Sequence, residues 1–374
     1  MSVMQSSNCF ILKLYCLGNS NSMTSNFLEI ENATFVASKQ NKVNNVSLTI
    51  KQEGEIICLL GPSGIGKTTM LRTIAGLQSL QSGRIKLKGK VISSEDYNLE
   101  PEKRNIALCF QDNSLFPHYN AIENINIGAK RNKNSKFSYS DNDLINILHL
   151  EEIKEKYPHE ISAGEAQRVS LARSLMSKPD LLLLDEPFSN IDQSLKDELQ
   201  KRIKDLLKEL NITTIAVTHD SYEAFYLADK CGIVLNQSLK QFDVPYNIYH
   251  YPNSIEVVKF LNRGILIDAE VTGNDTLKNS ELGTIKGKFV KKQSVGSSVK
   301  LLIQPEDLEH DDKSKLILEV IDRKFRGTNF IYTLKTKGNQ TFPVFVHSHH
   351  KHQHKIKDKF GIKTPIYVDH LVCF

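Results

Sequence analysis

The sequence lacks the features that define several large classes of protein. No run of about 18 consecutive apolar residues occurs, so we expect no segment that spans a bilayer. The 6 cysteines are scattered without a CxxC pair, which argues against a disulfide framework and favours a reducing compartment. The net charge of +5 is spread along the chain and is too small to indicate nucleic-acid binding. Sustained heptads are also missing, which argues against a long coiled coil.

The remaining composition is that of an ordinary globular protein. Hydrophobic residues make up 40% and charged residues 24% of 374 residues, a length that suits two domains better than one. Residues 1–22 lack the cationic lead of a secretion signal, and we expect them to form a disordered N-terminal extension.

Residues 61–69 read GPSGIGKTT and fit the phosphate-loop pattern GxxxxGK(S/T). The apolar run 55–60 predicts a buried strand and residues 69–75 predict a helix, which is the setting that the pattern requires. Backbone N–H groups and the helix start attract an anion, Lys67 reaches the outer phosphates, and the Thr68 hydroxyl can bind Mg²⁺. The predicted triphosphate site consists of Gly61, Pro62, Ser63, Gly64, Ile65, Gly66, Lys67, Thr68 and Thr69.

Strands alternate with helices up to about residue 240, which predicts an α/β fold with a largely parallel sheet. Its ligands should bind beyond the carboxyl ends of the strands. Residues 27–30 and 46–50 alternate like strands of a half-buried antiparallel sheet. The other expected strands are residues 82–90, 105–110, 181–184 and 213–218, and the expected helices are residues 141–154, 165–177 and 195–210.

The pattern changes after residue 240. A short helix is expected over residues 254–260, and closely spaced period-two segments follow it to the end. Strands without helices predict a small all-β domain, a barrel or a sandwich. We therefore expect residues 241–262 to be a linker and residues 263–374 to form this second domain.

Four polar residues follow predicted strands and are candidates for nucleotide chemistry. Asp185 is the acid expected to hold Mg²⁺ beside a phosphate loop, and Glu186 is placed to act as the base for an attacking water. Gln111 could add an oxygen ligand to Mg²⁺, and His219 could hydrogen-bond a γ-phosphate. Taken singly, a Gln or His at a strand end is more often an ordinary polar edge residue.

Five segments together resemble the ATP-binding subunits of ABC transporters. They read GPSGIGKTT, FQDNSLFPH, YPHEISAGEAQRVSLARSL, LLLLDEPFSNID and VTHD, in that order. The resemblance spans most of residues 27–240 and implies a P-loop ATPase cassette, over residues 23–240, with an antiparallel β subdomain and a helical subdomain. It also implies a homodimer that binds ATP and Mg²⁺ between its subunits.

The resemblance assigns further residues. In each chain, the segment containing Ser162, Ala163, Gly164 and Glu165 should contact the ATP of the partner subunit, although the family usually has Gly at position 163 and Gln at 165. Residues 189–192 should form the loop that communicates across the dimer, and Phe35 should stack on adenine. The alternative for Phe35 is an ordinary core phenylalanine.

The family context also implies partners. Residues 113–118 should dock on a membrane subunit, with an internal packing loop as the alternative, and the C-terminal domain is similar to one that serves dimer contacts and regulation. We expect the C-terminal domain to be an OB-like β domain. The chain should act beneath two permease subunits on the cytoplasmic face of the inner membrane, and a solute-binding protein should deliver the solute to the permease. Ferric iron is favoured over polyamine, sulfate or molybdate; an exporter subunit and a soluble ATPase acting on ribosomes or DNA are the rival roles.

One cluster is not explained by the resemblance. His347, His349, His350, His352 and His354 crowd into eight residues. Imidazole clusters bind transition metals, so a metal-sensing role is one hypothesis, and an exposed hairpin loop of biased composition is the other.

Overall fold

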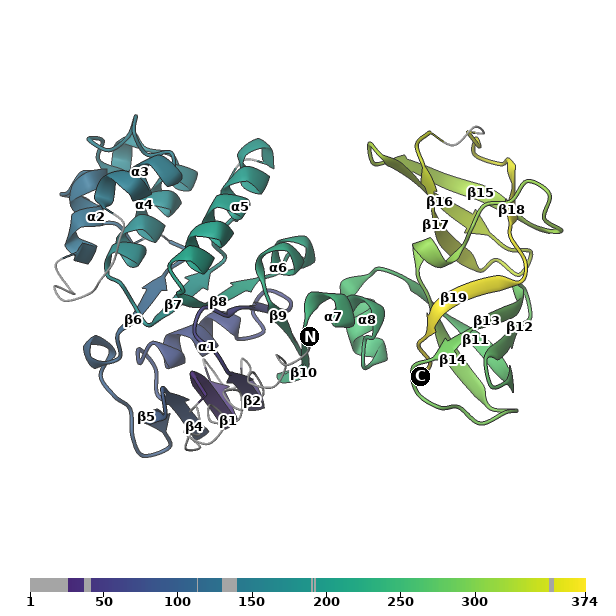
Figure 1. Cartoon of the computed structure of the whole chain (residues 1–374), viewed down its shortest axis with the longest axis horizontal. Helices are drawn as coiled ribbons and strands as arrows, with labels where there is room; N and C mark the ends of the chain where they lie inside the picture. The colour runs from purple at the N-terminus through teal and green to yellow at the C-terminus, as the bar shows by residue number, and fades with distance from the viewer. Residues whose placement is uncertain are drawn as a thin grey trace, which may run out of the picture.

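The computed structural model describes residues 26–36, 42–112, 114–129, 140–189, 191, 193–349 and 353–374. They form two lobes, N-terminal on the left and C-terminal on the right of Figure 1, joined by helices α7 (Pro245–His250) and α8 (Ile255–Leu261). Within these ranges, no helix is both long and apolar enough to cross a bilayer.

A six-stranded sheet forms the centre of the N-terminal lobe, counted over the described residues, with the strand order β10-β9-β3-β8-β7-β6. Its neighbours pair in parallel, except that β10 pairs with β9 in the antiparallel sense. The prediction of a largely parallel sheet is therefore confirmed. Its strands are β3 (Ile56–Leu60), β6 (Ile106–Cys109), β7 (Leu181–Asp185), β8 (Thr213–Thr218), β9 (Lys230–Leu235) and β10 (Ser238–Asp243).

The central strands are apolar along their whole length because both faces of the sheet are covered. Ile57 and Leu59 of β3 point into one core, whereas Cys58 and Leu60 point into the other. The first core is shared with helix α1, and the second with the remaining helices of the lobe. The helices are α1 (Lys67–Ile74), α2 (Ala121–Ala129), α3 (Asp141–Ile147), α4 (Ala163–Met176), α5 (Gln193–Glu209) and α6 (Ser221–Leu227).

An antiparallel sheet closes the lobe on the α1 side, whereas α2, α3 and α4 lie together at the opposite end (Figure 1). Its strand order is β2-β1-β4-β5. Helix α3 is shorter than the 14 residues expected, because His149 adopts a left-handed backbone (φ 51°) just beyond it. The strands of this sheet are β1 (Leu28–Val36), β2 (Lys42–Ile50), β4 (Ser82–Leu87) and β5 (Lys90–Ser94). Elsewhere in the described chain, short 3₁₀ turns cover Pro101–Lys103, Pro158–Glu160 and, in the C-terminal lobe, Pro305–Asp307.

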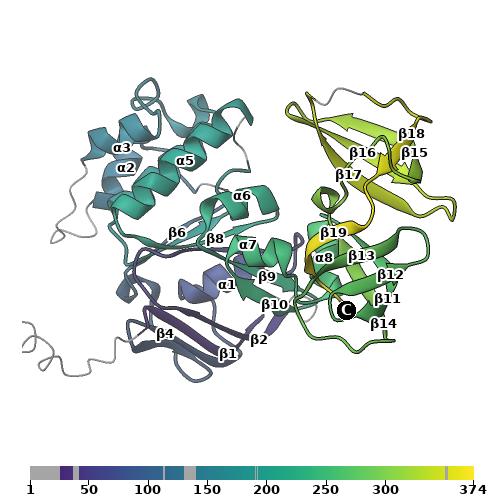
Figure 2. The ribbon, with the colours of Figure 1, turned by 45° about the vertical axis from the view of Figure 1, so that its right-hand side comes forward.

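The C-terminal lobe is all-β, as predicted. Of the two expected arrangements, a barrel or a sandwich, the structure has two sheets that share one core. Figure 2 shows the two sheets one above the other. One sheet has the order β14-β11-β12-β13-β19 and the other β17-β16-β15-β18. Their strands are β11 (Ile265–Gly273), β12 (Thr276–Asn279), β13 (Gly283–Phe289), β14 (Ser298–Ile303), β15 (Leu316–Phe325), β16 (Asn329–Lys335), β17 (Thr341–His347), β18 (Lys359–Ile362) and β19 (Ile366–Leu371).

Arg104 is a buried cation that ties α1 to the antiparallel sheet. Its guanidinium donates to the oxygens of Thr73 and Ile74 at the end of α1 and to Ile92 O of β5. Further hydrogen bonds go to Leu99, Ser93 and Asn98. Burial lowers the pKa of Arg104 to about 10, so the side chain stays charged at neutral pH and also complements the carboxyl end of the helix dipole.

We expect Arg104→Met to destabilise the N-terminal lobe by about 3 kcal/mol, because methionine fills the space but leaves buried carbonyl groups without a donor. Urea unfolding monitored by circular dichroism measures the change. The matched control is Lys103→Met at the exposed neighbouring residue, which should leave the midpoint of unfolding close to that of the wild type. Equal midpoints for the two variants would contradict this role for Arg104.

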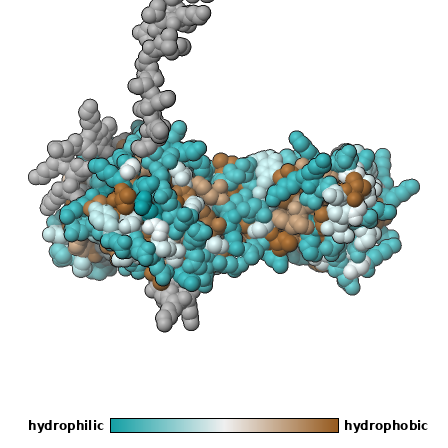
Figure 3. All heavy atoms as spheres, turned by 90° about the horizontal axis from the view of Figure 1, so that it is seen from below, coloured by the Kyte–Doolittle hydropathy of each residue, from teal (hydrophilic) through white to brown (hydrophobic). Residues whose placement is uncertain are grey.

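The two lobes meet through α7, α8 and the first residues of the C-terminal lobe. Tyr249 Oη donates to Glu306 Oε1 at 2.7 Å, and the Tyr251 hydroxyl lies 3.0 Å from His370 Nε2. Arg263 donates to Ser221 Oγ at 3.0 Å and lies 3.7 Å from the ring centre of Tyr222. Seen from below, hydrophobic residues also gather near the middle of the molecule (Figure 3). The junction is thus made of specific contacts as well as a covalent link.

Asp307 lies close to this junction and is the capping residue of the turn Pro305–Asp307. Its Oδ2 accepts from the Gln304 N–H at 2.6 Å, which favours the ionised form. Burial nevertheless raises the pKa of Asp307 to about 7, helped by the neighbouring carboxylates of Glu306 and Asp369.

This raised pKa predicts a pH-dependent stability. Between about pH 4, where an unfolded aspartate ionises, and pH 7, the folded chain holds a proton that the unfolded chain has lost, so stability falls as pH rises. Asp307→Asn keeps the acceptor and removes this titration. In urea unfolding, the free energy of unfolding of this variant relative to the wild type should rise by on the order of 3 kcal/mol from pH 4 to pH 8. A difference between variant and wild type that stays constant from pH 4 to pH 8 would refute the assignment.

Candidate functional site

The carboxyl ends of four strands meet at one edge of the six-stranded sheet. Leu60 of β3 pairs with Thr218 of β8, and Asp185 of β7 pairs with Val217. On the other side of β7, Leu184 pairs with Cys109, the last residue of β6. The segments that carry the phosphate loop, Gln111, Asp185 and His219 therefore begin at the same edge.

The loop of residues 61–66 has the curvature that a phosphate site requires. Gly64 and Gly66 have positive φ angles of 77° and 109°, which residues with a side chain rarely adopt. A Cβ at Gly61 would approach Val234 O to 2.4 Å, so only glycine fits there. The loop leads directly into α1, whose first N–H groups face outward as donors, and the site therefore fits a phosphate chain.

Lys67 and Thr68 are the first residues of α1 and point to different partners. Lys67 Nζ donates to Gly61 O at 2.7 Å and to Pro62 O at 3.0 Å, which holds the ammonium across the loop. Burial lowers the pKa of Lys67, against the attraction of Glu186 and Asp185. The ammonium is thus held against the first residues of the phosphate loop.

Thr68 and Asp185 form the second contact of the site. Thr68 Oγ1 donates to Asp185 Oδ1 at 3.0 Å. Burial raises the pKa of Asp185, whereas this hydrogen bond lowers it. A carboxylate beside a hydroxyl supplies the hard oxygen ligands that Mg²⁺ prefers, so the pair fits that ion.

Glu186 and His219 lie next to each other beyond Asp185. His219 Nδ1 is 3.3 Å from Glu186 Oε1, and Glu186 is the less exposed of the two, at 17% against 56% for the side chains. Glu186 adopts a left-handed backbone (φ 48°), an unusual conformation for a residue with a side chain. Its main-chain oxygen accepts from Gln167 Nε2 at 2.9 Å and from Ser189 Oγ at 3.0 Å.

Gln167 is a residue that the sequence analysis missed. It lies on α4, two residues after Glu165, and its side chain is buried against the turn that carries Glu186. Its position in the segment YPHEISAGEAQRVSLARSL was the available signal, but a glutamine inside a helix carries no chemistry by itself.

Gln111 lies two residues beyond β6, and its side chain is exposed. It shares the sheet edge with Asp185, one strand away. Its role as an Mg²⁺ ligand stays a prediction.

The segment at residues 162–165 opens α4 and is capped by its own side chains. Ser162 N–H and Ser162 Oγ both donate to Glu165 Oε2, at 2.7 and 2.8 Å, and Glu165 N–H donates to Ser162 Oγ at 3.3 Å. These hydrogen bonds, that of the Ser162 N–H first, lower the pKa of Glu165. The serine hydroxyl predicted to face a phosphate thus already has an anionic partner.

The assignment of Phe35 to adenine stacking is wrong. Phe35 lies on β1 opposite Val43, has an exposed fraction of 0%, and belongs to the core between α1 and the antiparallel sheet. A ring packed on both faces has none to offer a base, so the alternative, a core phenylalanine, is correct. In the predicted dimer loop 189–192, Asn190 and Asp192 lie outside the described residues.

The segment predicted to dock on a membrane subunit has one buried and one exposed side. Leu115 packs on the core beneath it, whereas Phe116 is 41% exposed. The buried Asn124 accepts from Phe116 N–H at 2.9 Å and donates to Phe116 O at 3.2 Å, and Arg173 donates to Ser114 O at 2.9 Å. Asn113 lies outside the described residues.

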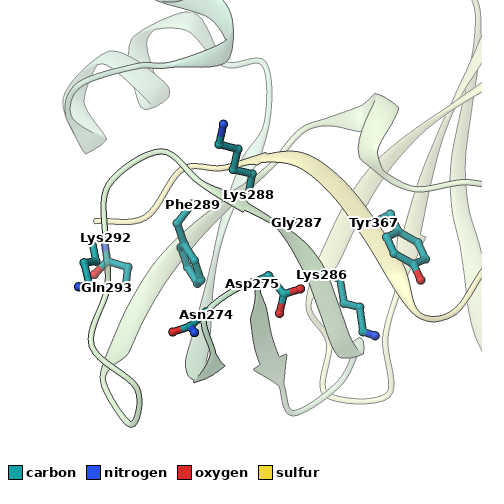
Figure 4. Close-up of a pocket in the computed structure, with 9 residues that line it drawn as sticks. All are labelled: Asn274, Asp275, Lys286, Gly287, Lys288, Phe289, Lys292, Gln293 and Tyr367. Carbon is teal, nitrogen blue, oxygen red and sulfur yellow. The ribbon is translucent and has the colours of Figure 1, made fainter.

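A separate surface pocket lies on the C-terminal lobe, far along the chain from the phosphate loop. Figure 4 shows Lys286, Lys288 and Lys292 around it with Asp275, and Tyr367 at one side. Its lining comes from residues 274–293 and Tyr367, so it is not part of the strand-end site.

Comparison with known proteins gives a consistent result. A family model described as ABC transporter matches residues 43–189. The Fe(3+) ions import ATP-binding protein of Fusobacterium nucleatum is 35% identical over 322 residues, which cover 85% of each chain. The sn-glycerol-3-phosphate import ATP-binding protein of Psychromonas ingrahamii is 37% identical over 277 residues, 73% of this chain and 72% of that one. The spermidine/putrescine import ATP-binding protein of Haemophilus ducreyi is 33% identical over 326 residues, 83% of this chain and 86% of that one.

Solved structures agree on the fold. A dimeric ATP-binding cassette in a post-hydrolysis state, bound to ADP and Pi, matches with a TM-score of 0.50 at 24% identity, covering 58% of this chain and 98% of its own. CbiO1 from Clostridium perfringens, part of the ABC transporter complex cbiONQ, matches with a TM-score of 0.52 at 24% identity, covering 63% and 94%.

Proposed function

The chain belongs to the ABC transporter family of ATP-binding proteins, and from that premise we propose that it is the ATP-hydrolysing subunit of an importer for ferric iron. The observation that carries the proposal is the meeting of Lys67, Thr68, Asp185 and Glu186 at one sheet edge, in a chain whose relatives are import ATP-binding proteins. Among those relatives, several are ferric-iron proteins, which favours iron over polyamine or glycerol phosphate.

The roles follow from the positions of the side chains. Lys67 and the loop N–H groups would bind the β- and γ-phosphates of ATP, while Thr68, Asp185 and Gln111 would hold Mg²⁺. When bound, Mg²⁺ neutralises phosphate charge during transfer. Thr68 and Asp185 already share a hydrogen bond, so little rearrangement is needed to bring both oxygens to one ion.

Glu186 would orient and deprotonate the attacking water. Its carboxylate lies beside His219, which would hydrogen-bond the γ-phosphate. The main-chain contact from Gln167 holds the turn in which Glu186 sits. Glu186 is the first residue beyond β7, and its backbone is left-handed.

A second copy of the chain would complete the site. Helix α4 and helix α1 belong to different cores on opposite faces of the sheet, which favours a role of Ser162 toward the ATP of a partner subunit. In such a homodimer, Ser162, Ala163, Gly164 and Glu165 would approach the γ-phosphate across the interface, with the helix start as donor.

Glu165 is expected to weaken this contact, because its carboxylate repels phosphate and occupies the Ser162 hydroxyl. We predict that Glu165→Gln lowers the ATP concentration for half-maximal turnover roughly five-fold, about 1 kcal/mol, since glutamine keeps the cap without the charge. A steady-state ATP titration measures the change. Glu160→Gln, at the end of the preceding turn, is the control, and an unchanged or raised ATP requirement in the Glu165 variant would exclude the repulsion.

The exposed part of residues 114–118 would dock on a permease subunit. Phe116 offers an apolar ring, and the hydrogen bonds of Asn124 and Arg173 hold the segment in place for docking. The full assembly would contain two such chains beneath two permease subunits on the cytoplasmic face of the inner membrane, supplied by a solute-binding protein. The C-terminal lobe would serve dimer contacts and regulation.

Uptake measurements test the proposal. A strain that lacks this gene should lose uptake of radiolabelled Fe³⁺ and keep uptake of spermidine and sn-glycerol-3-phosphate, and the wild-type gene should restore it. Lys67→Ala should fail to restore uptake. If the strain instead lost uptake of spermidine or glycerol phosphate, that compound would replace iron as the proposed solute. Unchanged uptake of all three would reject the importer role for these solutes.

A further inference from the structure

Three metal-ligating side chains meet in the C-terminal lobe, away from the nucleotide site. His310, Asp312 and His354 each offer one ligand atom, and these atoms all lie within 4.8 Å of one another. The Nε2 atoms of the two histidines are 2.9 Å apart, and His310 Nε2 is 3.2 Å from Asp312 Oδ1. Residues separated by 44 positions in the sequence are thus brought to one point.

The structure divides the histidine run seen in the sequence. His347 and His349 are exposed and stack on each other, with ring centres 5.5 Å apart. His354 instead turns inward, is 9% exposed, and faces His310. His350 and His352 lie outside the described residues. His310, which faces His354, therefore comes from a segment that the sequence pattern did not indicate.

The two imidazoles are held in place by the sheet around them. His310 bridges to Ile362 of β18, and Asp311 N–H donates to Gly361 O at 3.0 Å. The ring of Phe360 packs against both histidines, with centre distances of 4.4 Å to His310 and 4.7 Å to His354. Because these contacts already fix the rings, little side-chain entropy remains to be lost when a ligand binds.

The chemistry of the trio suits a divalent ion. The two facing nitrogens are 2.9 Å apart, and neutral imidazoles that carry their protons on the opposite ring nitrogens can turn both lone pairs to one metal ion. Asp312 adds a negative charge, and its side chain is 49% exposed while that of His310 is 5% exposed, so the trio opens to solvent through the carboxylate. Two imidazoles and one carboxylate form a set typical of Zn²⁺ and of Fe²⁺ with further positions open.

The distances are close to those of a real site. Ligand atoms about 2.1 Å from one ion are roughly 3.0 Å apart at a right angle and about 3.4 Å apart in a tetrahedron. The separations of 2.9 and 3.2 Å from His310 to its two partners are therefore close to those around a bound ion, and the ligand atoms of His354 and Asp312 lie within 4.8 Å of each other.

We propose that His310, Asp312 and His354 form a binding site for a divalent first-row transition-metal ion. The ion would link the segment after β17 to the segment beside β18 and so stabilise the C-terminal lobe. The proposal is independent of the transported solute.

Calorimetric titration of the chelator-treated, full-length protein with Zn²⁺, and with Fe²⁺ under anaerobic conditions, tests the site. The wild type should bind one ion in this lobe, and His354→Gln and Asp312→Asn should each weaken binding at least about ten-fold. Asp312 is exposed, so that variant tests the site even if His354→Gln fails to fold. Visible bands of bound Co²⁺ should appear in the wild type and fade in both variants.

The matched control is the double variant His347→Asn, His349→Asn, which removes two exposed imidazoles and spares the trio. It should bind the metal like the wild type. Metal binding that is lost in this control but kept in His354→Gln and Asp312→Asn would assign the metal to the surface run and overturn the proposal. Absence of binding to the wild type would overturn it as well.

Discussion

Replacing Glu186 with glutamine is expected to leave MgATP binding intact and to lower ATP turnover on the order of 10²-fold or more, the usual effect of removing a positioned base. Glutamine keeps the size of the side chain and can still lie against His219, but it cannot accept the proton of an attacking water. Because the main-chain contacts from Gln167 and Ser189 involve the oxygen of residue 186, they survive the substitution.

Two measurements separate this loss from a structural defect. Nucleotide binding, followed by fluorescence of a labelled ATP, should match the wild type, and phosphate release should be nearly absent. Glu209→Gln, at the exposed end of α5, is the matched control and should hydrolyse ATP normally. Phosphate release by the Glu186 variant at near wild-type rates would show that another group activates the water.

Replacing Lys67 with alanine is expected to act earlier in the cycle. Loss of a charge-assisted hydrogen bond to phosphate should weaken MgATP binding roughly 10- to 100-fold, corresponding to about 1.5–3 kcal/mol, and turnover should fall below detection. The ammonium is buried and held by Gly61 O and Pro62 O, so the substitution removes a cation that the loop itself fixes in place.

The comparison with Lys90→Ala, an exposed lysine of β5, controls for the loss of one positive charge. That variant should bind ATP like the wild type. Binding of MgATP by Lys67→Ala with unchanged affinity, at saturating Mg²⁺, would remove Lys67 from the phosphate site.

The sequence predicted the N-terminal lobe well where local pattern and tertiary surroundings agree. Residues 61–68 need glycine conformations and a helix start that are encoded locally, and the apolar run 181–184 has no stable position other than inside a covered sheet. The meeting of Thr68 with Asp185 then follows from the parallel pairing of the strands, because their carboxyl ends meet at one edge.

The features that the sequence did not predict depend on contacts between residues far apart in the chain. Phe35 lies on an alternating strand, and such a pattern does not say whether the ring faces a core or a ligand. His310 reaches His354 through its bridge to Ile362 of β18, a pairing that neither segment shows on its own. The cap formed by Ser162 and Glu165, in contrast, follows the S-x-x-E pattern and was recognisable in the sequence.

The contact of Arg263 has a mechanical consequence. Arg263 precedes the first strand of the C-terminal lobe, yet it makes contacts in the N-terminal lobe. It donates a hydrogen bond to Ser221 and lies over the ring of Tyr222, two and three positions after His219. A reorientation of the C-terminal lobe therefore has to move or break this contact, which lies two and three residues from His219.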